Sequence, residues 1–183
     1  MKKIRYLALF LSLGITACDR VSEEKSQYES KPQIPMNAHS IMVSYDFNPY
    51  SKTEEADQFF SKTLIRDIEK WAKTRLRMSS PEGIVQISMR KATIAGIPNM
   101  TNLEALEGSL DVVLNIINSN GSLVSYVEAS VIQRLSAPAN MTDAEYDTLK
   151  KKLIIKLVDA LDKEVETALY TKINNPYSGR VIK

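Results

Sequence analysis

The sequence has only one cysteine, Cys18, and one histidine, His39, among 183 residues. A single cysteine excludes an internal disulfide, and a single histidine excludes a multi-histidine metal site within one chain. Because His39 lies at the boundary of the predicted tether, we also expect no His-based triad. The motifs G-x-S-x-G, G-x-G-x-x-G and H-E-x-x-H and a Walker loop are also missing. We therefore expect no catalytic residue, no metal ion and no cofactor. A pair of carboxylates that meets only in the folded chain is the alternative left open.

Long apolar runs are missing too, apart from one between Tyr6 and Ile15. This run is too short to span a bilayer, and the basic residues before it are typical of a secretory signal peptide. The sequence Ile15-Thr16-Ala17-Cys18 then resembles the lipobox of bacterial lipoproteins. The resemblance implies cleavage before Cys18 and its acylation, which would hold the protein on a membrane, facing the periplasm. The alternative is an ordinary signal peptide with a chance cysteine, and the choice between inner and outer membrane is left open.

An excess of positive charge is absent once the signal peptide is set aside. The formal net charge of +2 includes Lys2, Lys3 and Arg5, and without them 21 basic residues stand against 22 acidic ones. A chain with balanced charge lacks the electrostatic footprint of nucleic-acid-binding proteins. The expected partners are therefore the membrane, through acylated Cys18, and an envelope protein, with no nucleic acid.

Composition divides the chain after the signal peptide (residues 1–17) into three parts. Residues 18–37 are rich in Ser, Glu, Lys, Gln and Pro without an apolar pattern, which predicts a lipidated cysteine followed by a flexible tether. Residues 38–173 are long enough to bury a core and predict one periplasmic domain. Residues 174–183 contain Asn-Asn-Pro and Ser-Gly, which predict a frayed tail.

Alternation of apolar and polar side chains predicts four strands, at residues 41–47, 83–94, 109–117 and 124–135. The sequence Asn118-Ser119-Asn120-Gly121 predicts a hairpin turn between the last two, because Asn and Gly tolerate positive φ. Turn-forming residues between 99 and 107 predict a loop.

Two helices are predicted by apolar stripes at helical spacing, each preceded by a capping box. The first helix follows Ser51-x-x-Glu54 and has Trp71 on its stripe, and the second follows Thr142-x-x-Glu145 and has Leu153 on its stripe. We expect Trp71 and Leu153 to lie in one core.

The element order β-α-β-β-β-α predicts an α+β fold. In this fold both helices pack on one face of a four-stranded, mostly antiparallel sheet. The basic run Lys150-Lys151-Lys152 is predicted to be a solvated helical face.

The other face of the predicted sheet has no helix on it. Alternation places Val113, Tyr126 and Ile132 on this face, where they interrupt polar side chains. Scattered exposed apolar residues are common on protein surfaces, so one interpretation is an ordinary solvated face. The other interpretation is a candidate partner-binding surface.

Short motifs along the mature chain resemble a group of small bacterial lipoproteins of uncharacterised function. These motifs are Trp71-Ala72-x-x-Arg75-Leu76, Gly83, Ala92, Leu110-Asp111-Val112, Gly121 and Leu161-Asp162-Lys163-Glu164. The element order is also similar to that of the outer-membrane lipoprotein that assists lipopolysaccharide assembly inside a β-barrel. This second likeness is one of topology and carries no residues across.

Two functions are compatible with these features. The first is a non-catalytic, membrane-anchored envelope lipoprotein that binds or scaffolds another component in envelope assembly or transport. The alternative is a lipid- or small-ligand-binding accessory lipoprotein of a transporter. A roomy apolar cavity between helices and sheet would favour the accessory protein, whereas a filled core with an exposed mixed face would favour the binding or scaffolding role.

Overall fold

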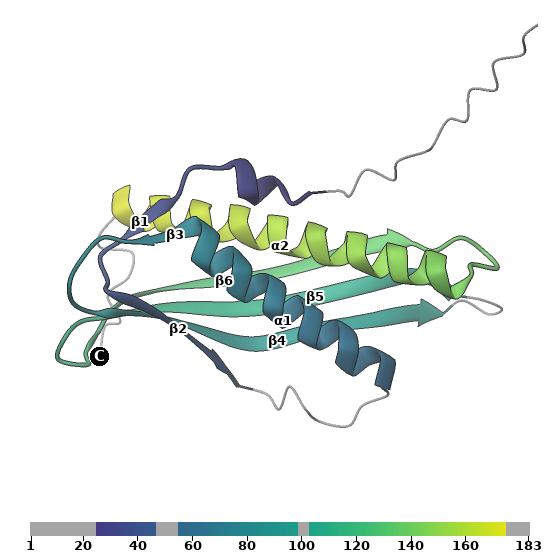
Figure 1. The fold of residues 1–183 in the computed structure, drawn as a ribbon, viewed down its shortest axis with the longest axis horizontal. Coiled ribbons are helices and arrows are strands. Elements are labelled where there is room, and N and C mark those ends of the chain that lie inside the picture. Colours follow the sequence, from purple (N-terminus) through teal and green to yellow (C-terminus); the bar gives the residue numbers. More distant parts are fainter. Residues whose placement is uncertain (1–24, 47–54, 99–102, 175–183) are drawn as a thin grey trace, which may run out of the picture.

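The computed structural model describes residues 25–46, 55–98 and 103–174. Its main sheet has four strands in the order β2-β4-β5-β6 (Figure 1). Their bounds are Ser40–Tyr45 for β2, Ile84–Pro98 for β4, Leu103–Ile117 for β5 and Leu123–Ser136 for β6. Strand β2 is parallel to β4, and the other two pairings are antiparallel. The predicted α+β fold with a four-stranded, mostly antiparallel sheet is confirmed.

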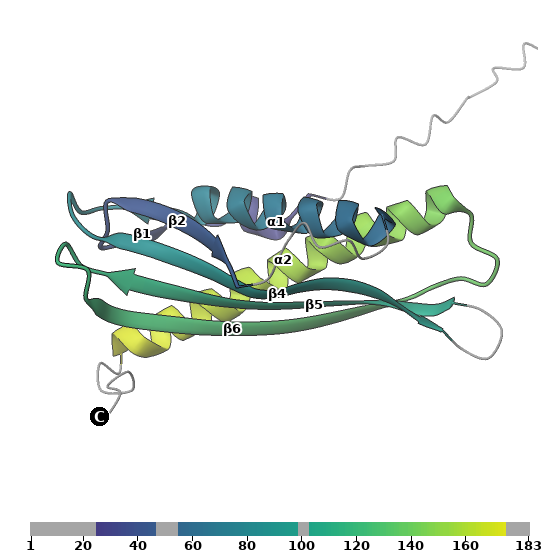
Figure 2. The same cartoon turned by 90° about the horizontal axis from the view of Figure 1, so that it is seen from below.

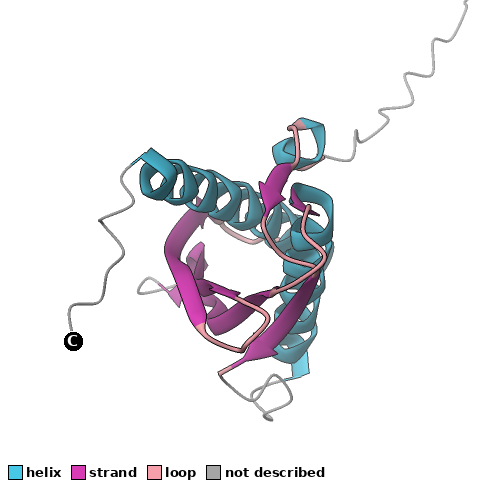
Figure 3. Ribbon diagram, turned by 90° about the vertical axis from the view of Figure 1, so that its left-hand side faces the viewer, coloured by secondary structure: helices cyan, strands magenta, loops and turns pink. Residues whose placement is uncertain are grey.

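Two helices, α1 (Glu55–Arg75) and α2 (Asp143–Asn174), cover one face of this sheet (Figures 2 and 3). Helix α2 starts at the predicted capping box: the Thr142 N–H donates to Glu145 Oε2 at 2.8 Å, and the Glu145 N–H donates to Thr142 Oγ1 at 3.3 Å. This exchange satisfies two backbone donors that a helix start leaves unpaired. The capping box predicted at 51–54 lies outside the described residues.

The core lies between the helices and the sheet. Trp71 and Leu153 are both fully buried in it, which confirms the phases predicted for the two helical stripes. At Gly108 of β5, side chains of α2 come close to the backbone of the sheet. A Cβ built on Gly108 would overlap with Cδ1 of Leu157 and lie 3.4 Å from Cδ2 of Leu153. Side chains of α2 therefore fill this part of the core down to the backbone of β5.

The segment before β2 differs from the predicted tether. It forms a short 3-10 helix, η1 (Gln27–Ser30), and a strand, β1 (Ile34–Met36), which pairs in parallel with β3 (Leu76–Met78). Tyr28, Ile34 and Met36 are buried. Isolated apolar residues in a polar stretch give too weak a pattern to predict this, because their burial depends on surfaces that α1 and α2 supply from elsewhere in the chain.

Two further details differ from the predictions. Residues 103–107, expected in a loop, belong to β5, where Ala105 pairs with Ile97 of β4. In the basic run, Lys151 and Lys152 are exposed as predicted, but the solvated position is wrong for Lys150. Lys150 is buried, and its Nζ lies 4.0 Å from the centroid of the Tyr146 ring, whose face attracts the ammonium group.

Candidate contact surface on the open sheet face

Strand register defines which side chains point away from the helices, and we call this side of the main sheet the open face. Val112 and Leu114 of β5 are buried toward the helices, so Val113 and Asn115 lie on the open face. Tyr126 is paired with Asn115, and Ile132 with Ser109. The structure therefore brings Val113, Tyr126 and Ile132 to the same side, as alternation predicted.

Val113 is nevertheless only 3% exposed, so its prediction as an accessible contact residue is wrong. It lies between Ser88 of β4 and Glu128 of β6, which are its cross-strand partners. Arg90 Nη1 of β4 is 3.1 Å from Glu128 Oε1 of β6. Since β5 runs between these two strands, the long side chains of this ion pair must reach across it near Val113.

Other polar pairs also link strands across the open face. Ser44 Oγ of β2 is 3.0 Å from Ser88 Oγ of β4, and Arg134 Nη2 of β6 is 2.7 Å from Glu107 Oε2 of β5. These exposed or half-buried pairs contribute little to stability, but they cover the middle of the sheet with polar atoms. Ile132, at 64% exposed, is an isolated apolar side chain in these surroundings.

Apolar side chains gather at the end of the open face near the β5–β6 hairpin. Ile84, Ile117 and Leu123 form one row of cross-strand neighbours on β4, β5 and β6. In the next row, Met42 of β2 and Tyr126 of β6 stand at the two edges, with Gln86 and Asn115 between them. Met42 is 45% and Leu123 55% exposed, and the other three are partly buried. We call these five residues the hairpin-end patch: Met42, Ile84, Ile117, Leu123 and Tyr126.

Sequence reasoning identified Tyr126 as a candidate but missed Met42, Ile84 and Leu123. Alternation alone would place Leu123 on the helix side with Val127, and only the register shift in the β5–β6 pairing sets it opposite Ile117. Met42 and Ile84 carry no local signal either, because their neighbourhood depends on the parallel pairing of β2 with β4, which joins segments separated by all of α1.

A second polar cluster lies on the helix side of the molecule and holds the N-terminal segment. Asp162 of α2 accepts hydrogen bonds from Trp71 Nε1 at 3.0 Å, from Arg75 Nε and from Lys31 Nζ at 2.7 Å. Lys31 Nζ also lies 3.2 Å from Glu166 Oε2. We call these five residues the N-terminal clamp, since they tie the chain after η1 to both helices.

The electrostatics of the clamp favour a structural role. Burial by itself would raise the pKa of the Asp162 carboxyl, but the hydrogen bonds from Arg75, Lys31 and Trp71 outweigh burial and hold that pKa below its ordinary value. The hydrogen bond to Asp162 is also the main reason that the pKa of Lys31 is raised. Both groups thus stay charged and paired at neutral pH, which is the opposite of what a proton-transferring acid or base requires.

We also searched the described residues for a metal site and for a membrane-spanning helix. Within 25–46, 55–98 and 103–174, His, Cys, Asp and Glu side chains form no group of three or more that could hold a metal ion. No helix in that part of the chain is both long and apolar enough to cross a membrane. Cys18, the predicted lipidation site, lies outside the described residues.

Comparison with known proteins gives neighbours in fold only. No family model and no curated protein matches the sequence. Among solved structures, rare lipoprotein B from Shewanella oneidensis is 9% identical with a TM-score of 0.40, over 74% of this chain and 97% of that chain. A minor lipoprotein from Acinetobacter baumannii is 13% identical with a TM-score of 0.40, over 76% of this chain and 96% of its own.

A PelC dodecamer from Paraburkholderia phytofirmans also matches, at 12% identity and a TM-score of 0.31, over 72% of this chain and 92% of its own. At identities and TM-scores this low, the similarity concerns only the general arrangement of strands and helices. It gives no information about individual site residues. The structural neighbours of this protein thus include bacterial lipoproteins of low sequence identity.

Proposed function

We propose that the protein is a lipid-anchored envelope lipoprotein that acts by contact, binding another envelope protein through the open face of its sheet. The observation that carries this proposal is the hairpin-end patch, in which Met42 and Leu123 expose large apolar side chains on a face that neither α1 nor α2 covers. Buried aromatic and aliphatic anchors surrounded by polar groups are the usual composition of a protein interface. Here Tyr126 and Leu123 would be the anchors, and the polar pairs around Val113 would form the rim.

A contact role is favoured over catalysis by the chemistry of the chain. Catalysis would require a nucleophile or a titrating group with an activating partner. The buried carboxylate of Asp162 is neutralised by its own partners in the N-terminal clamp. A ligand-binding accessory role is less well supported, because the core under α2 is filled at Gly108.

Partner capture tests the contact surface. Leu123→Glu and Tyr126→Glu each place a charge in the hairpin-end patch and should reduce recovery of crosslinked envelope partners by at least tenfold, which corresponds to about 1.4 kcal/mol. Ile132→Glu probes the isolated apolar residue further along β6 and should have a smaller effect. Ala139→Glu, in the exposed connection to α2, adds the same charge far from the patch and should leave recovery unchanged.

Circular dichroism and denaturant melts must show that each variant is folded. Undiminished recovery with folded Leu123→Glu and Tyr126→Glu would reject the patch as the contact surface. Turnover of an envelope substrate by the purified monomer would reject the contact role itself.

The anchor is tested separately at Cys18. Cys18→Ser removes the sulfur that would carry the lipid, so the variant should remain unprocessed or fractionate as a soluble protein. Fractionation with and without high salt separates lipid anchoring from peripheral adsorption. A Cys18→Ser protein that matures normally and stays with membranes in high salt would contradict the lipid anchor.

A further inference from the structure

We infer that the outer side of α2 lies against the surface of the anchoring membrane and that it recognises anionic lipid headgroups. This inference rests on the proposed lipid anchor at Cys18. It follows from the place where the N-terminal segment is fastened, from the length of chain before that place, and from the charges around it.

The N-terminal segment is fastened to the helix layer, both at the middle of α2 and at α1, where Lys70 Nζ lies 2.6 Å from Glu29 Oε1 of η1. The Tyr28 N–H donates to Asp159 Oδ1 at 3.3 Å, and Lys31 pairs with Asp162 and Glu166 through the N-terminal clamp. Tyr28 itself is buried. Figure 1 shows η1 lying along α2 on the side of the helix layer, away from the open face of the sheet. A chain coming from the membrane therefore first meets the domain at the helix layer.

The connection to the membrane is short. Only residues 19–26 separate Cys18 from the start of η1. Whatever their conformation, eight residues reach at most about 29 Å, at roughly 3.6 Å each. Helix α2, with 32 residues, is about 48 Å long at 1.5 Å per residue. The attachment point on the helix layer therefore stays within about 29 Å of the lipid, which is less than the length of α2. Since the open face lies on the opposite side of the domain, we infer that it points away from the membrane.

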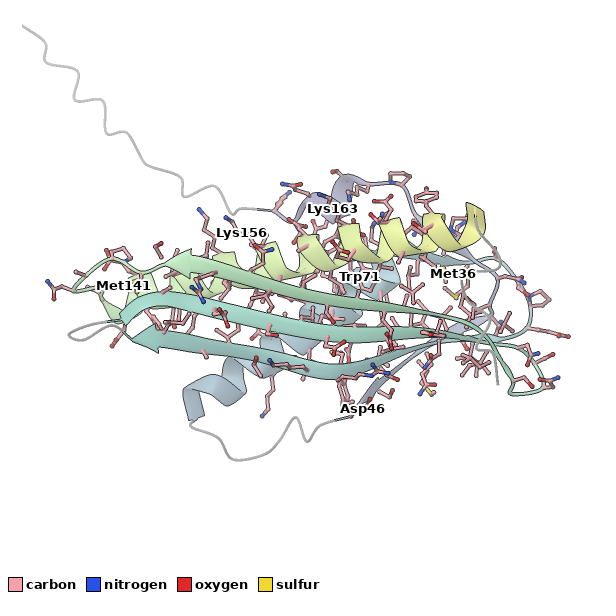
Figure 4. The ribbon with its side chains drawn as sticks, turned by 180° about the vertical axis from the view of Figure 1, so that it is seen from behind. Met36, Asp46, Trp71, Met141, Lys156 and Lys163 are labelled. Carbon is pink, nitrogen blue, oxygen red and sulfur yellow. The ribbon has the colours of Figure 1, made fainter. Side chains whose placement is uncertain are left out.

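Basic side chains lie on the side of α2 that would face the lipid. At 100° per residue, Lys152, Lys156 and Lys163 fall within an arc of about 40° on the outer side of the helix. All three are exposed, and we call them the basic stripe. Figure 4 shows Lys156 and Lys163 projecting from α2 away from the sheet, on the side where η1 lies. Lysine side chains attract the anionic headgroups of bacterial membranes.

The acidic residues beside the basic stripe are engaged within the protein. Asp159 accepts the Tyr28 N–H, and Glu166 lies 3.2 Å from Lys31 and 3.3 Å from Arg75. Glu145 falls on the same arc near the helix start, where it is held by Thr142. Toward the other end of α2, the arc carries exposed Tyr170, a residue type that favours the headgroup region of bilayers. Along the middle of α2, where the N-terminal segment arrives, the three lysines of the basic stripe stand against the carboxylate of Asp159, so the outer side of the helix is net positive there.

Depth-dependent fluorescence quenching tests this orientation in the lipidated full-length protein. Acylation consumes the sulfur of Cys18, so a thiol introduced by Thr167→Cys on the outer side of α2 can be labelled alone. Ser130→Cys, exposed on the open face, is the matched control. In vesicles of phosphatidylethanolamine and phosphatidylglycerol that contain a quencher-bearing lipid, the label at 167 should be quenched at least threefold more than the label at 130.

Charge reversal tests the recognition of headgroups. Lys156→Glu and Lys163→Glu should each reduce the quenching at 167 at least twofold, and so should phosphatidylcholine vesicles, which carry no net charge. Lys91→Glu, exposed on β4 at the open face, makes the same charge change and should have no effect. Quenching at 167 that is insensitive to both changes would overturn the role assigned to the basic stripe.

The two proposals fail in different ways. Protein that does not float with the vesicles would contradict the lipid anchor. The proposed orientation of α2 on the membrane would then be rejected as well, because it depends on that anchor. Protein that floats but shows equal quenching at 167 and 130 would overturn the orientation while leaving the anchor intact.

Discussion

Arg75 and Asp162 form an ion pair in which both side chains are fully buried, with Nε of Arg75 2.5 Å from Oδ1 of Asp162. The pair joins the last turn of α1 to the middle of α2, and the same carboxylate accepts a hydrogen bond from Trp71. Two charges removed from water are costly unless each satisfies the other, so the pair binds the helices in one relative position. Lys31 extends this arrangement to the N-terminal segment.

Removing one charge of this pair should destabilise the fold strongly. Asp162→Asn keeps the size of the side chain but removes the buried carboxylate on Arg75 Nε, leaving only the more exposed Glu166 as a counter-ion. We expect a loss of about 3–5 kcal/mol in the free energy of unfolding. Urea denaturation followed by circular dichroism measures this loss. A double variant, Arg75→Met with Asp162→Leu, removes both charges and should be more stable than Asp162→Asn. A double variant that is no more stable would show that the buried charge is not the cause.

The lowered pKa of Asp162 predicts a pH dependence of stability. Because that pKa is lower in the folded than in the unfolded chain, the ionised carboxyl contributes its full stabilisation above the unfolded value, about 3.9. The contribution is lost as the pH falls from there through the lower folded pKa. The free energy of unfolding should therefore decline below about pH 4 more steeply in the wild type than in Asp162→Asn.

Asp67 provides the matched control for acid titration. Burial raises the pKa of its carboxyl, so protonation of Asp67 favours the folded state as the pH falls. Asp67→Asn should therefore make the acid-induced loss of stability larger, whereas Asp162→Asn should make it smaller. Parallel curves for wild type and Asp162→Asn would contradict the assignment.

The shared core of the two helices predicts the effect of truncating their central side chains. Trp71→Ala and Leu153→Ala should each lower the free energy of unfolding by about 2–5 kcal/mol, because both side chains are fully buried and would leave cavities. Denaturant melts give these values. Thr148→Ala, at an exposed position on α2, should change stability by less than about 0.5 kcal/mol and serves as the control.

Close packing at Gly108 predicts that even one added methyl group is unfavourable. Gly108→Ala would push against Cδ1 of Leu157 and should destabilise the protein by about 1–3 kcal/mol. A compensating Leu157→Val change in the same chain should recover part of the loss if the clash is the cause. Gly121→Ala is an informative comparison, because no atom lies near its added Cβ and only its positive φ of 82° opposes the substitution.

Local pattern was enough to predict the helices, most of the strands and the open face. Trp71 and Leu153 lie where the helical stripes predicted, and Tyr126 and Ile132 lie on the face that two-residue alternation assigned to them. These features depend on periodicities of a few residues, which any stretch of sequence carries by itself. The capping box at Thr142 is equally local, and it is present as predicted.

Contacts between distant segments determined the features of the fold and of the contact surface that local pattern did not predict. Tyr28 and Lys31 are ordered by groups on α2 that are more than 130 residues away, so a stretch with the composition of a tether is folded from Gln27 onward. Val113 has the alternation of an exposed residue but is buried among side chains of the neighbouring strands. Burial is a property of the assembled surface, and it was the tertiary structure that shifted the candidate contacts to the hairpin-end patch.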